Sequence, residues 1–430
     1  MTPASDSLYV WFIDVGMGDA TFVKFPDGTT MLIDFGSTKA EQIKGDILNF
    51  FQVLKDNKFI TSVPFDIDYL FITHPDQDHY NLLQFLIKAG YSFKNIFFTG
   101  QHDDYKAKGK IEDKKGNKWN SFKDWLKDQE NHRKAFQLNQ PNGQKSWQKH
   151  GDAEVHLLAA NVANQGKHTT LANNRSIVLM IEYKGQKILL AADATYITEK
   201  KILDNINSAN GNLKGLDISN AILKLGHHGS ARTSTSKEWV ETVKPICLFI
   251  SSERTGTQYG QGGNASGHRL PQQAAIDTVK QFAPNSLKKT TDCLPIRGEF
   301  HSYVAYHDDV DKPTNCFGKS RSVSKFCEAD QIDTLEEKTI LREDISEVSN
   351  YYYEKRTDNQ IFTTICKLDY PIKRGTGQPK RPKIIADRGT TYGLEIKSNS
   401  KYMIYPWLGE EFEDFDHWTE DDTYYHLGEE

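Results

Sequence analysis

The chain of 430 residues has little cysteine and contains no Cys-x-x-Cys pair. Its five cysteines are an odd number and are widely spaced, which indicates neither a disulfide framework nor a zinc site built from thiolates. Unpaired cysteines of this kind suit a reducing compartment. They are Cys247, Cys293, Cys316, Cys327 and Cys366.

Long apolar runs and an N-terminal targeting signal are also missing. No apolar run approaches the roughly 18 residues that a membrane-spanning helix needs. The first residues, MTPASDSLYVWFIDVG, hold no basic region, no long apolar core and no small-residue cleavage site. We therefore expect a soluble protein without membrane contact, most simply located in the cytoplasm.

An excess of basic residues is absent too, since 53 Lys and Arg face 58 Asp and Glu and the formal net charge is -5. This balance excludes a protein that coats nucleic acid over its whole surface. Contact with nucleic acid must then come from local basic patches, or from bound cations where a phosphate would lie. The content of 37% hydrophobic and 11% aromatic residues is enough to fill a core, which argues against general disorder.

Strand-like and helix-like apolar patterns alternate along the first three hundred residues, which predicts an α/β fold. A hairpin is expected around the turn at Lys184-Gly185. Helices are expected at 43–54 and 82–89, and strands at 8–14, 30–34, 66–73, 96–99, 176–183, 187–193, 221–225 and 246–250.

Two regions differ from this pattern. Residues 101–150 are polar and rich in lysine, with three tryptophans and few aliphatic side chains, and we expect an insertion over the core. The composition changes again beyond about residue 310, so we expect a main domain over residues 1–310 and a C-terminal extension over 311–430. The last segment, Gly409 to Glu430, has ten acidic residues and no Lys or Arg. Because like charge repels a phosphate backbone, this segment is a candidate for docking on a protein partner.

The most informative segment is His74-Pro-Asp-Gln-Asp-His79, which directly follows an apolar strand pattern. It places four metal-ligating side chains within six residues, on a loop whose root is fixed by the strand. Imidazole and carboxylate together suit Zn²⁺, Mn²⁺ or iron. A solvated acidic turn with chance histidines is the alternative for this segment taken alone.

Two later segments strengthen the metal hypothesis. Asp193 ends an apolar strand, where a carboxylate is costly unless it is paired or bound to a cation. After the next apolar strand comes Gly226-His-His-Gly-Ser230, in which glycines allow the backbone to turn sharply around two possible ligands. The order of these three segments along the chain is hard to reach by chance.

With these segments in place, the sequence resembles the metallo-β-lactamase superfamily, and within it the branch that contains the nuclease domain of the DNA-uptake protein ComEC. The resemblance covers roughly residues 8–305 and implies an αββα sandwich carrying the insertion and the extension. It is carried by FIDVGMGDA (12–20), LIDFG (32–36), THPDQDH (73–79), NNRSIVL (173–179), ILLAAD (188–193), LKLGHHGSARTSTS (223–236) and GHRLP (267–271).

The resemblance implies two divalent metal ions, Zn or Mn. His74 and Asp76 would hold one, Asp78 and His79 the other, and Asp193 would bridge both. His227 or His228 would complete the second site, and the resemblance does not decide between them. The wider family's third histidine should fall near Asn174, where this chain has an Asn-Asn pair, with His168 as a possible substitute.

Further roles follow from the same resemblance. Asp78 and His268 are the predicted catalytic residues, with His268 as a donor of the proton that the departing oxygen needs. Lys224 and Ser230 are predicted to hold a non-bridging phosphate oxygen, whereas Arg232 is better explained as surface polarity. Departures from the family pattern are Ala192 in place of a glycine, and Tyr80 with Asn81 in place of small residues. We expect Tyr80 and Asn81 to narrow that side of the cleft.

Three functions remain open at this point. The first is a metal-dependent nuclease that cleaves DNA phosphodiester bonds with a water activated by two metals. The second is a phosphodiesterase acting on a small nucleotide or a phosphorylcholine-type ester. The third is a metal-binding module that recognises a partner through its extension. Tryptophans 119, 125 and 147 among lysines are candidate contacts for nucleic acid, although a solvated surface explains them as well.

Overall fold

A computed structural model of the chain describes the main domain almost completely and the C-terminal part in short segments. His168 and His268 lie outside the described residues, and so does the acidic segment except for residues 426–427. The described residues are 4–13, 15, 18–38, 40–162, 171–251, 273–282, 299–302, 351–353, 365–367, 391–407 and 426–427.

The first sheet is antiparallel on one side and parallel on the other. Strands β1 to β3 pair antiparallel, and β3, β4, β5 and β8 pair parallel. In spatial order it contains β20 (His426–Leu427), β19 (Tyr402–Trp407), β18 (Thr391–Ile396), β1 (Leu8–Phe12), β2 (Gly18–Lys24), β3 (Thr30–Ser37), β4 (Asp66–Ile72), β5 (Ser92–Phe98) and β8 (Ala135–Gln137).

The second sheet is mixed in the same way. Strands β9 to β12 pair antiparallel, and β12 to β15 pair parallel. Its spatial order is β15 (Glu299–Ser302), β14 (Cys247–Ser251), β13 (Ile222–Lys224), β12 (Gln186–Leu190), β11 (Val178–Tyr183), β10 (Ala153–Ala159) and β9 (Gln144–His150).

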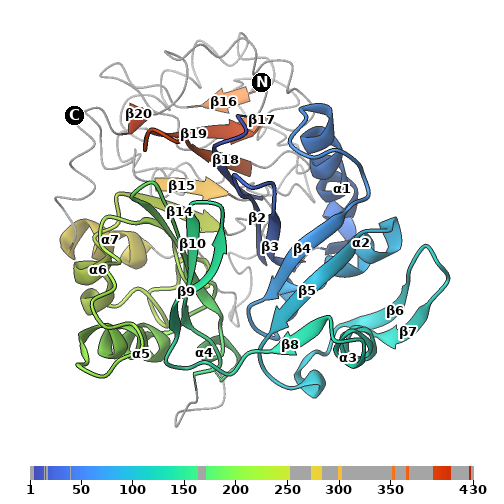
Figure 1. Ribbon diagram of the computed structural model, residues 1–430, viewed down its shortest axis with the longest axis horizontal. Coiled ribbons are helices and arrows are strands. Elements are labelled where there is room, and N and C mark those ends of the chain that lie inside the picture. Colours follow the sequence, from blue (N-terminus) through green and yellow to red (C-terminus); the bar gives the residue numbers. More distant parts are fainter. Residues whose placement is uncertain are drawn as a thin grey trace, which may run out of the picture.

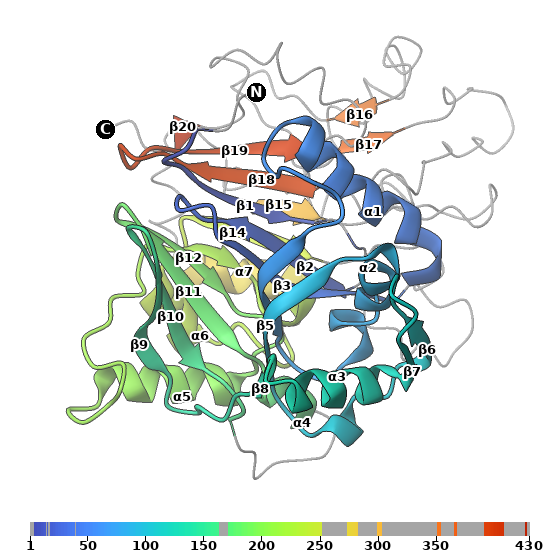
Figure 2. The ribbon, with the colours of Figure 1, turned by 45° about the vertical axis from the view of Figure 1, so that its right-hand side comes forward.

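The two sheets pack face to face, and helices cover their outer faces, as Figures 1 and 2 show. The first sheet is covered by α1 (Ala40–Asp56), α2 (Leu83–Ala89) and α3 (Phe122–Asn131). The second is covered by α5 (Tyr196–Asn207), α6 (Lys237–Val243) and α7 (Gln273–Phe282). This is the four-layer αββα arrangement that the sequence predicts.

Alternating side chains of each strand serve two different cores. Leu8, Val10 and Phe12 of β1 point between the sheets, whereas Tyr9 and Trp11 point toward the helices. Because both faces of the strand are buried, β1 reads as a continuous apolar run, which explains its clear signal in the sequence. The predicted elements of the main domain are present, but several others had not been recognised, among them β2, β8 to β10, α3 and α5 to α7.

The lysine-rich region contributes to the sandwich at both ends. Its strand β8 extends the first sheet and its strand β9 begins the second, so the chain crosses between the sheets here. Between them, β6 (Lys108–Glu112) and β7 (Lys118–Ser121) form a separate hairpin beside α3. The short strands β16 (Tyr351–Tyr353) and β17 (Ile365–Lys367) pair with each other.

Strands from the C-terminal part extend the first sheet. β18 pairs with β1 from Leu8↔Ile396 to Phe12↔Tyr392, and β19 pairs with β18. The Ser7 hydroxyl and the Tyr9 hydroxyl both donate to the buried Glu395 carboxylate, at 2.9 and 3.0 Å. A domain boundary at residue 310 stays a prediction, but residues 391–407 pack as part of the main sheet. Among the described residues, no helix combines the length and apolar character needed to cross a bilayer.

Candidate metal centre

The HPDQDH loop leaves the carboxyl end of β4 and forms a short 3-10 turn, η1 (Gln77–His79). Two glycines of neighbouring strands allow this turn to lie directly on the sheet. A Cβ at Gly36 would overlap the backbone of Asp78 and His79, and a Cβ at Gly18 would meet the carbonyl of Asp78. Gly18 of the FIDVGMGDA segment and Gly36 of the LIDFG segment are therefore required by close packing against the ligand loop.

A single buried carboxylate orients two histidines of this loop. Asp34 Oδ2 lies 2.7 Å from His79 Nδ1 and accepts a hydrogen bond from the Thr73 hydroxyl at 2.6 Å. Thr73 Oγ1 lies 3.1 Å from His74 Nδ1, which donates to it because the hydroxyl proton is already given to Asp34. In its neutral form each ring thus carries its proton on Nδ1 and presents the Nε2 lone pair toward the site.

Asp193 follows β12 and lies between the histidines. Its side chain is 4% exposed, and the residue before it, Ala192, has a φ of 47°. This left-handed conformation favours glycine, so the backbone is strained at Ala192. Asp34, His227 and His228 at the site also have positive φ.

The two adjacent histidines, on η4 (His227–Gly229), point to different sides of Asp193. His227 Nε2 lies 3.6 Å from Asp193 Oδ2, and His228 Nε2 lies 3.7 Å from Asp193 Oδ1. Each ring is fixed by its other nitrogen: His227 Nδ1 contacts Thr233 Oγ1 at 2.5 Å, and His228 Nδ1 donates to the Ser251 carbonyl at 2.9 Å. The sequence left open which of the two histidines completes the site, and in the structure both face Asp193.

Donor atoms gather around each Asp193 oxygen. Near Oδ1 lie His79 Nε2, at 3.5 Å, and His228, whose Nε2 is also 3.6 Å from Asp78 Oδ2. Near Oδ2 lie His227 and His74, whose Nε2 is 3.8 Å from Oδ2 and 3.5 Å from Asp76 Oδ2. Each group holds two imidazoles, one carboxylate of the loop and one oxygen of Asp193.

This donor set fits divalent cations. Ligands at about 2.05 Å from a tetrahedral zinc ion lie roughly 3.3 Å apart, close to the spacings found here. The Nε2 atoms of His74, His79 and His228, together with Asp193 Oδ1, are buried and have no hydrogen-bond partner among the described residues. Because buried polar atoms are rarely left unpaired, their convergence is best explained by a cation. The ligand atoms of His74, His79 and Asp193 lie close enough to one another to share an ion, and so do those of Asp78, His79 and His228.

Charges in the cluster shift each other's pKa. Burial alone would raise the pKa of Asp193, but His228, His227 and His79 outweigh it and hold this pKa well below its usual range. Burial likewise opposes ionisation of Asp78, yet contacts with His228 and His79 lower its pKa to about 2. Conversely, Asp193 and Asp34 overcome burial and raise the pKa of His79 well above its ordinary value. Asp193 and Asp78 are therefore ionised at neutral pH.

The two residues of the Asn-Asn pair, on α4 (Leu171–Asn174), make different contacts. Asn173 Nδ2 lies 3.3 Å from Asp193 Oδ2 and 3.2 Å from His227 Nε2, so this amide faces the cluster. The predicted ligand Asn174 is fully buried, and its Oδ1 accepts a hydrogen bond from the Thr195 hydroxyl. Metal ligation by Asn174 stays a prediction, but its neighbour Asn173 is the better placed of the two.

The residues considered as phosphate contacts differ in their burial and in their bonding partners. Lys224 is 2% exposed and its ammonium pairs with the buried Asp19 carboxylate of the opposite sheet. Ser230 is 5% exposed, and its Oγ accepts from the Thr233 hydroxyl at 2.9 Å. Arg232 is exposed. Substrate binding by Lys224 and Ser230 stays a prediction, although Lys224 already has a buried partner.

The expectation that Tyr80 and Asn81 narrow the cleft was wrong. Tyr80 is fully buried, packs against Tyr105 and Phe122, and accepts a hydrogen bond from the Ala107 amide at 2.9 Å. Asn81 instead bonds the backbone of Ser37 through both its oxygen and its nitrogen. Because η1 turns these side chains away from the ligands, they fix the loop and leave the cluster open.

Comparisons with known proteins agree with this architecture. Residues 13–92, which include the HPDQDH loop, match the family model described as the metallo-beta-lactamase superfamily. The chain has the metallo-β-lactamase fold. This match, together with the donor clusters, points to a metal-dependent hydrolase. No curated protein sequence matches the chain.

Solved structures with a similar fold are distant in sequence. A mutant of the CmlA beta-hydroxylase is 14% identical with a TM-score of 0.34, over 67% of this chain and 52% of that one. The Zn²⁺-bound PqqB from Methylobacterium extorquens is 10% identical with a TM-score of 0.32, over 69% of this chain and 97% of that one. This chain thus spans about half of the CmlA protein, and likeness at this level says nothing of activity.

Four residues of the site had no predicted role. Asp34, Asp19 and Thr73 lie inside the segments that carry the family resemblance, but no role was predicted for them from the sequence. Thr233 lies six residues after His227, in the LKLGHHGSARTSTS segment. Hydrogen-bonding partners of metal ligands are harder to recognise than ligands, because a threonine or aspartate has many ordinary uses.

Proposed function

We propose that this protein is a metal-dependent phosphodiesterase whose substrate is DNA. The observation that carries the proposal is the division of ligands around Asp193, with two imidazoles and a loop carboxylate near each of its oxygens. Divalent cations held in such a pair of sites activate a water nucleophile and neutralise charge that develops on phosphoryl oxygens. Resemblance to the ComEC branch supports DNA as the polymer.

The chain's own residues define how a substrate approaches. The side chains of His74, His79 and Asp193 are at most 4% exposed and form the floor of the site. Those of Asp76, Asp78 and His227 are 46%, 24% and 19% exposed. A phosphodiester therefore approaches from the side where these three residues reach solvent. The carboxylates on that side repel phosphate, so binding of substrate requires cations in both ligand groups.

The direct test is hydrolysis by the purified full-length protein with Mn²⁺, Zn²⁺ or Mg²⁺. Supercoiled plasmid, linear duplex, single-stranded DNA and bis(4-nitrophenyl) phosphate are offered separately. Cleavage of the DNA substrates that stops with chelator and returns with metal is expected. Activity on the small ester with none on DNA would overturn the choice of substrate, and activity unaffected by a chelator would overturn the metal mechanism.

Asp193→Asn provides the matching variant. The amide keeps the volume but removes the charge that both ligand groups share, so we expect turnover to fall at least roughly 100-fold with the fold intact. Asp217→Asn is the control, because Asp217 pairs with Lys187 at the opposite end of the second sheet and should keep full activity. Turnover of Asp193→Asn close to the unsubstituted rate would show that the site is assigned incorrectly.

A further inference from the structure

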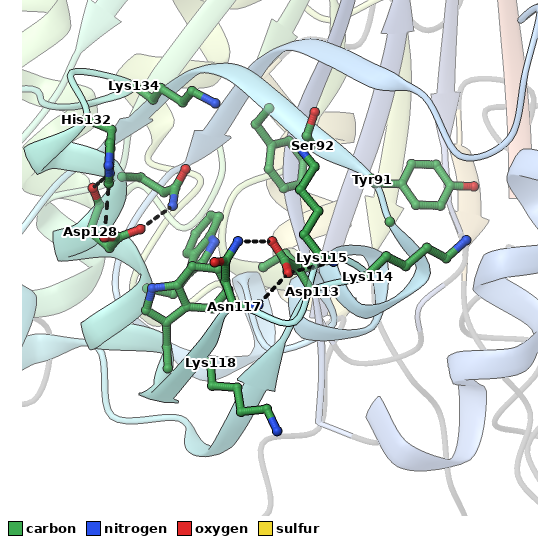
Figure 3. A pocket seen from close by; sticks show the side chains of 16 residues that line it. Tyr91, Ser92, Asp113, Lys114, Lys115, Asn117, Lys118, Asp128, His132 and Lys134 are labelled. Carbon is green, nitrogen blue, oxygen red and sulfur yellow. Dashed lines mark hydrogen bonds and ion pairs between the residues drawn. The ribbon is translucent and has the colours of Figure 1, made fainter.

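A separate pocket lies at the other end of the first sheet (Figure 3). It is bounded by the end of α2, the start of β5, the tip of the β6–β7 hairpin and the end of α3, and its volume is about 480 Å³. Cavities of this size are in the range of ligand sites. Ser92, at its edge, begins β5, whereas the metal ligands follow the opposite ends of the parallel strands. A seven-residue strand spans roughly 20 Å, so this pocket is distinct from the metal cluster.

The pocket carries an excess of positive charge. Lys114, Lys115, Lys118 and Lys134 line it, and all four are exposed. Figure 3 shows Lys115 and Lys134 reaching over it from different elements. Lys118 lies 3.4 Å from a Glu112 oxygen, whereas the other three form no ion pair with a carboxylate in the part of the chain that the structure describes.

Two carboxylates of the pocket are already engaged. Asp113 accepts hydrogen bonds from the backbone amides of Lys115 and Asn117 and from the Asn117 side chain, all at 2.9 Å. It therefore stabilises the hairpin turn, since two of these bonds come from Asn117, one from its backbone and one from its side chain. Asp128 lies at the end of α3, where its side chain accepts from Gln129 at 3.1 Å and its Oδ1 is 3.5 Å from His132 Nδ1. Neither acid forms an ion pair with Lys114, Lys115 or Lys134 in the described part of the chain, although the charge of Lys115 contributes to lowering the pKa of Asp113.

An aromatic wall accompanies the lysines. Trp119 of β7 is partly exposed and lines the pocket, as does the buried Trp125 of α3. The Trp125 ring packs against Phe122 and Phe93, with centroids 5.0 and 6.1 Å away, which holds this wall in place. Lysines around an indole provide both requirements of single-strand binding, namely charge for the backbone and a flat surface for a base.

We propose that this basic pocket, defined by Lys114, Lys115, Lys118, Lys134 and Trp119, binds single-stranded nucleic acid. The phosphate backbone lies along the lysines and one unpaired base stacks on Trp119. A duplex keeps its bases inside the helix, so a recessed indole between a hairpin and two helices is reached only by an unpaired base. The proposal rests on the proposed function in treating nucleic acid as the substrate, and it adds a second point of attachment away from the cleavage site.

Binding is measured by fluorescence anisotropy of a dye-labelled single-stranded DNA in excess EDTA, so that no cleavage occurs. Lys115→Gln/Lys134→Gln is compared with Lys214→Gln/Lys244→Gln, which removes the same charge from exposed positions on the second-sheet side. We expect the pocket variant to bind about tenfold more weakly at low salt, and its plot of log affinity against log salt to flatten by about 1.4, or 0.7 for each lost phosphate contact. The control pair should behave as the unsubstituted protein.

Equal weakening in both pairs, or in neither, would overturn the proposal. Duplex DNA binding as tightly through the same lysines would overturn its single-strand part, and displacement of the DNA by an equal concentration of mononucleotide would indicate a site for free nucleotide instead. Hydrolysis of bis(4-nitrophenyl) phosphate separates the two proposals. A pocket variant with normal small-ester hydrolysis and unchanged DNA binding disproves only the pocket. If the pocket variant loses DNA binding and the unsubstituted protein cleaves no phosphodiester, only the proposed function is disproved.

Discussion

Replacing Asp34 by asparagine should alter two predicted metal ligands, His79 by direct contact and His74 through Thr73. In the native chain, Asp34 Oδ1 accepts from the Thr73 amide at 2.7 Å, and Oδ2 accepts from the Thr73 hydroxyl and from His79 Nδ1. An asparagine oriented with its oxygen toward the Thr73 amide would place its NH₂ group beside His79 Nδ1. That nitrogen would then have to accept, which moves the ring proton to Nε2 and blocks ligation.

The same substitution reaches His74 through Thr73. With NH₂ donating to Thr73 Oγ1, the hydroxyl proton turns toward His74 Nδ1, and this histidine also acquires the wrong tautomer. The opposite orientation of the amide preserves both tautomers, but it places NH₂ against the buried Thr73 N–H, at a cost of about 1–3 kcal/mol. Partners of this kind typically contribute 10–100-fold to metal affinity, equivalent to about 1.4–2.7 kcal/mol.

Metal affinity is measured by equilibrium competition with a fluorescent chelator, so turnover is not needed. Asp34→Asn should weaken Zn²⁺ or Mn²⁺ binding within that 10–100-fold range. Asp68→Asn is the matched control, because Asp68 accepts the same pair of bonds, from the Thr30 amide and hydroxyl at 2.9 and 3.0 Å, but contacts no histidine. An Asp34→Asn protein that folds normally and binds metal with unchanged affinity would refute the tautomer reasoning.

Two further predictions concern stability. Asp19→Asn should lower the free energy of unfolding in urea by about 3–5 kcal/mol, because it leaves the Lys224 ammonium buried and unpaired. The double variant Asp19→Leu/Lys224→Met should recover most of this loss. Equal losses for both variants would contradict the ion-pair argument. Burial raises the pKa of Glu199 to about 7 against the opposing hydrogen bonds from Ser236 and Thr235. Since the folded chain holds this proton more tightly than the unfolded chain, whose pKa is near 4.5, about 3 kcal/mol of stability present below pH 4.5 should disappear as pH rises through 7. Glu199→Gln should remove that dependence, and an unchanged pH profile would count against it.

Much of the sandwich was predictable because many of its strands are apolar on both faces and because α1 has a clear three- and four-residue period, whereas α3, α5, α6 and α7 were not predicted. The strands that were missed show why prediction stopped there. β2 carries a glycine and an aspartate at its start, and β10 contains a histidine and a glutamate, so neither has a continuous apolar run. β18 was not recognised as part of the main sheet because its pairing with β1 joins residues far apart in the chain.

The sequence by itself determined which side chains are candidate metal ligands and in what order they follow the strands. Ligand chemistry is a property of residue type, and a short segment such as HPDQDH keeps its residues close in any fold. Only the tertiary structure decided that His227 and His228 face different oxygens of Asp193, that Asp34 fixes the tautomers of both His74 and His79, and that Tyr80 is buried. Those outcomes depend on backbone angles and on contacts between distant strands, of which the pairing of Asp19 with Lys224, 205 residues later, is the clearest case. Residue type and sequence order thus identify the candidate ligands, whereas contacts between distant strands decide which of these side chains lie close together.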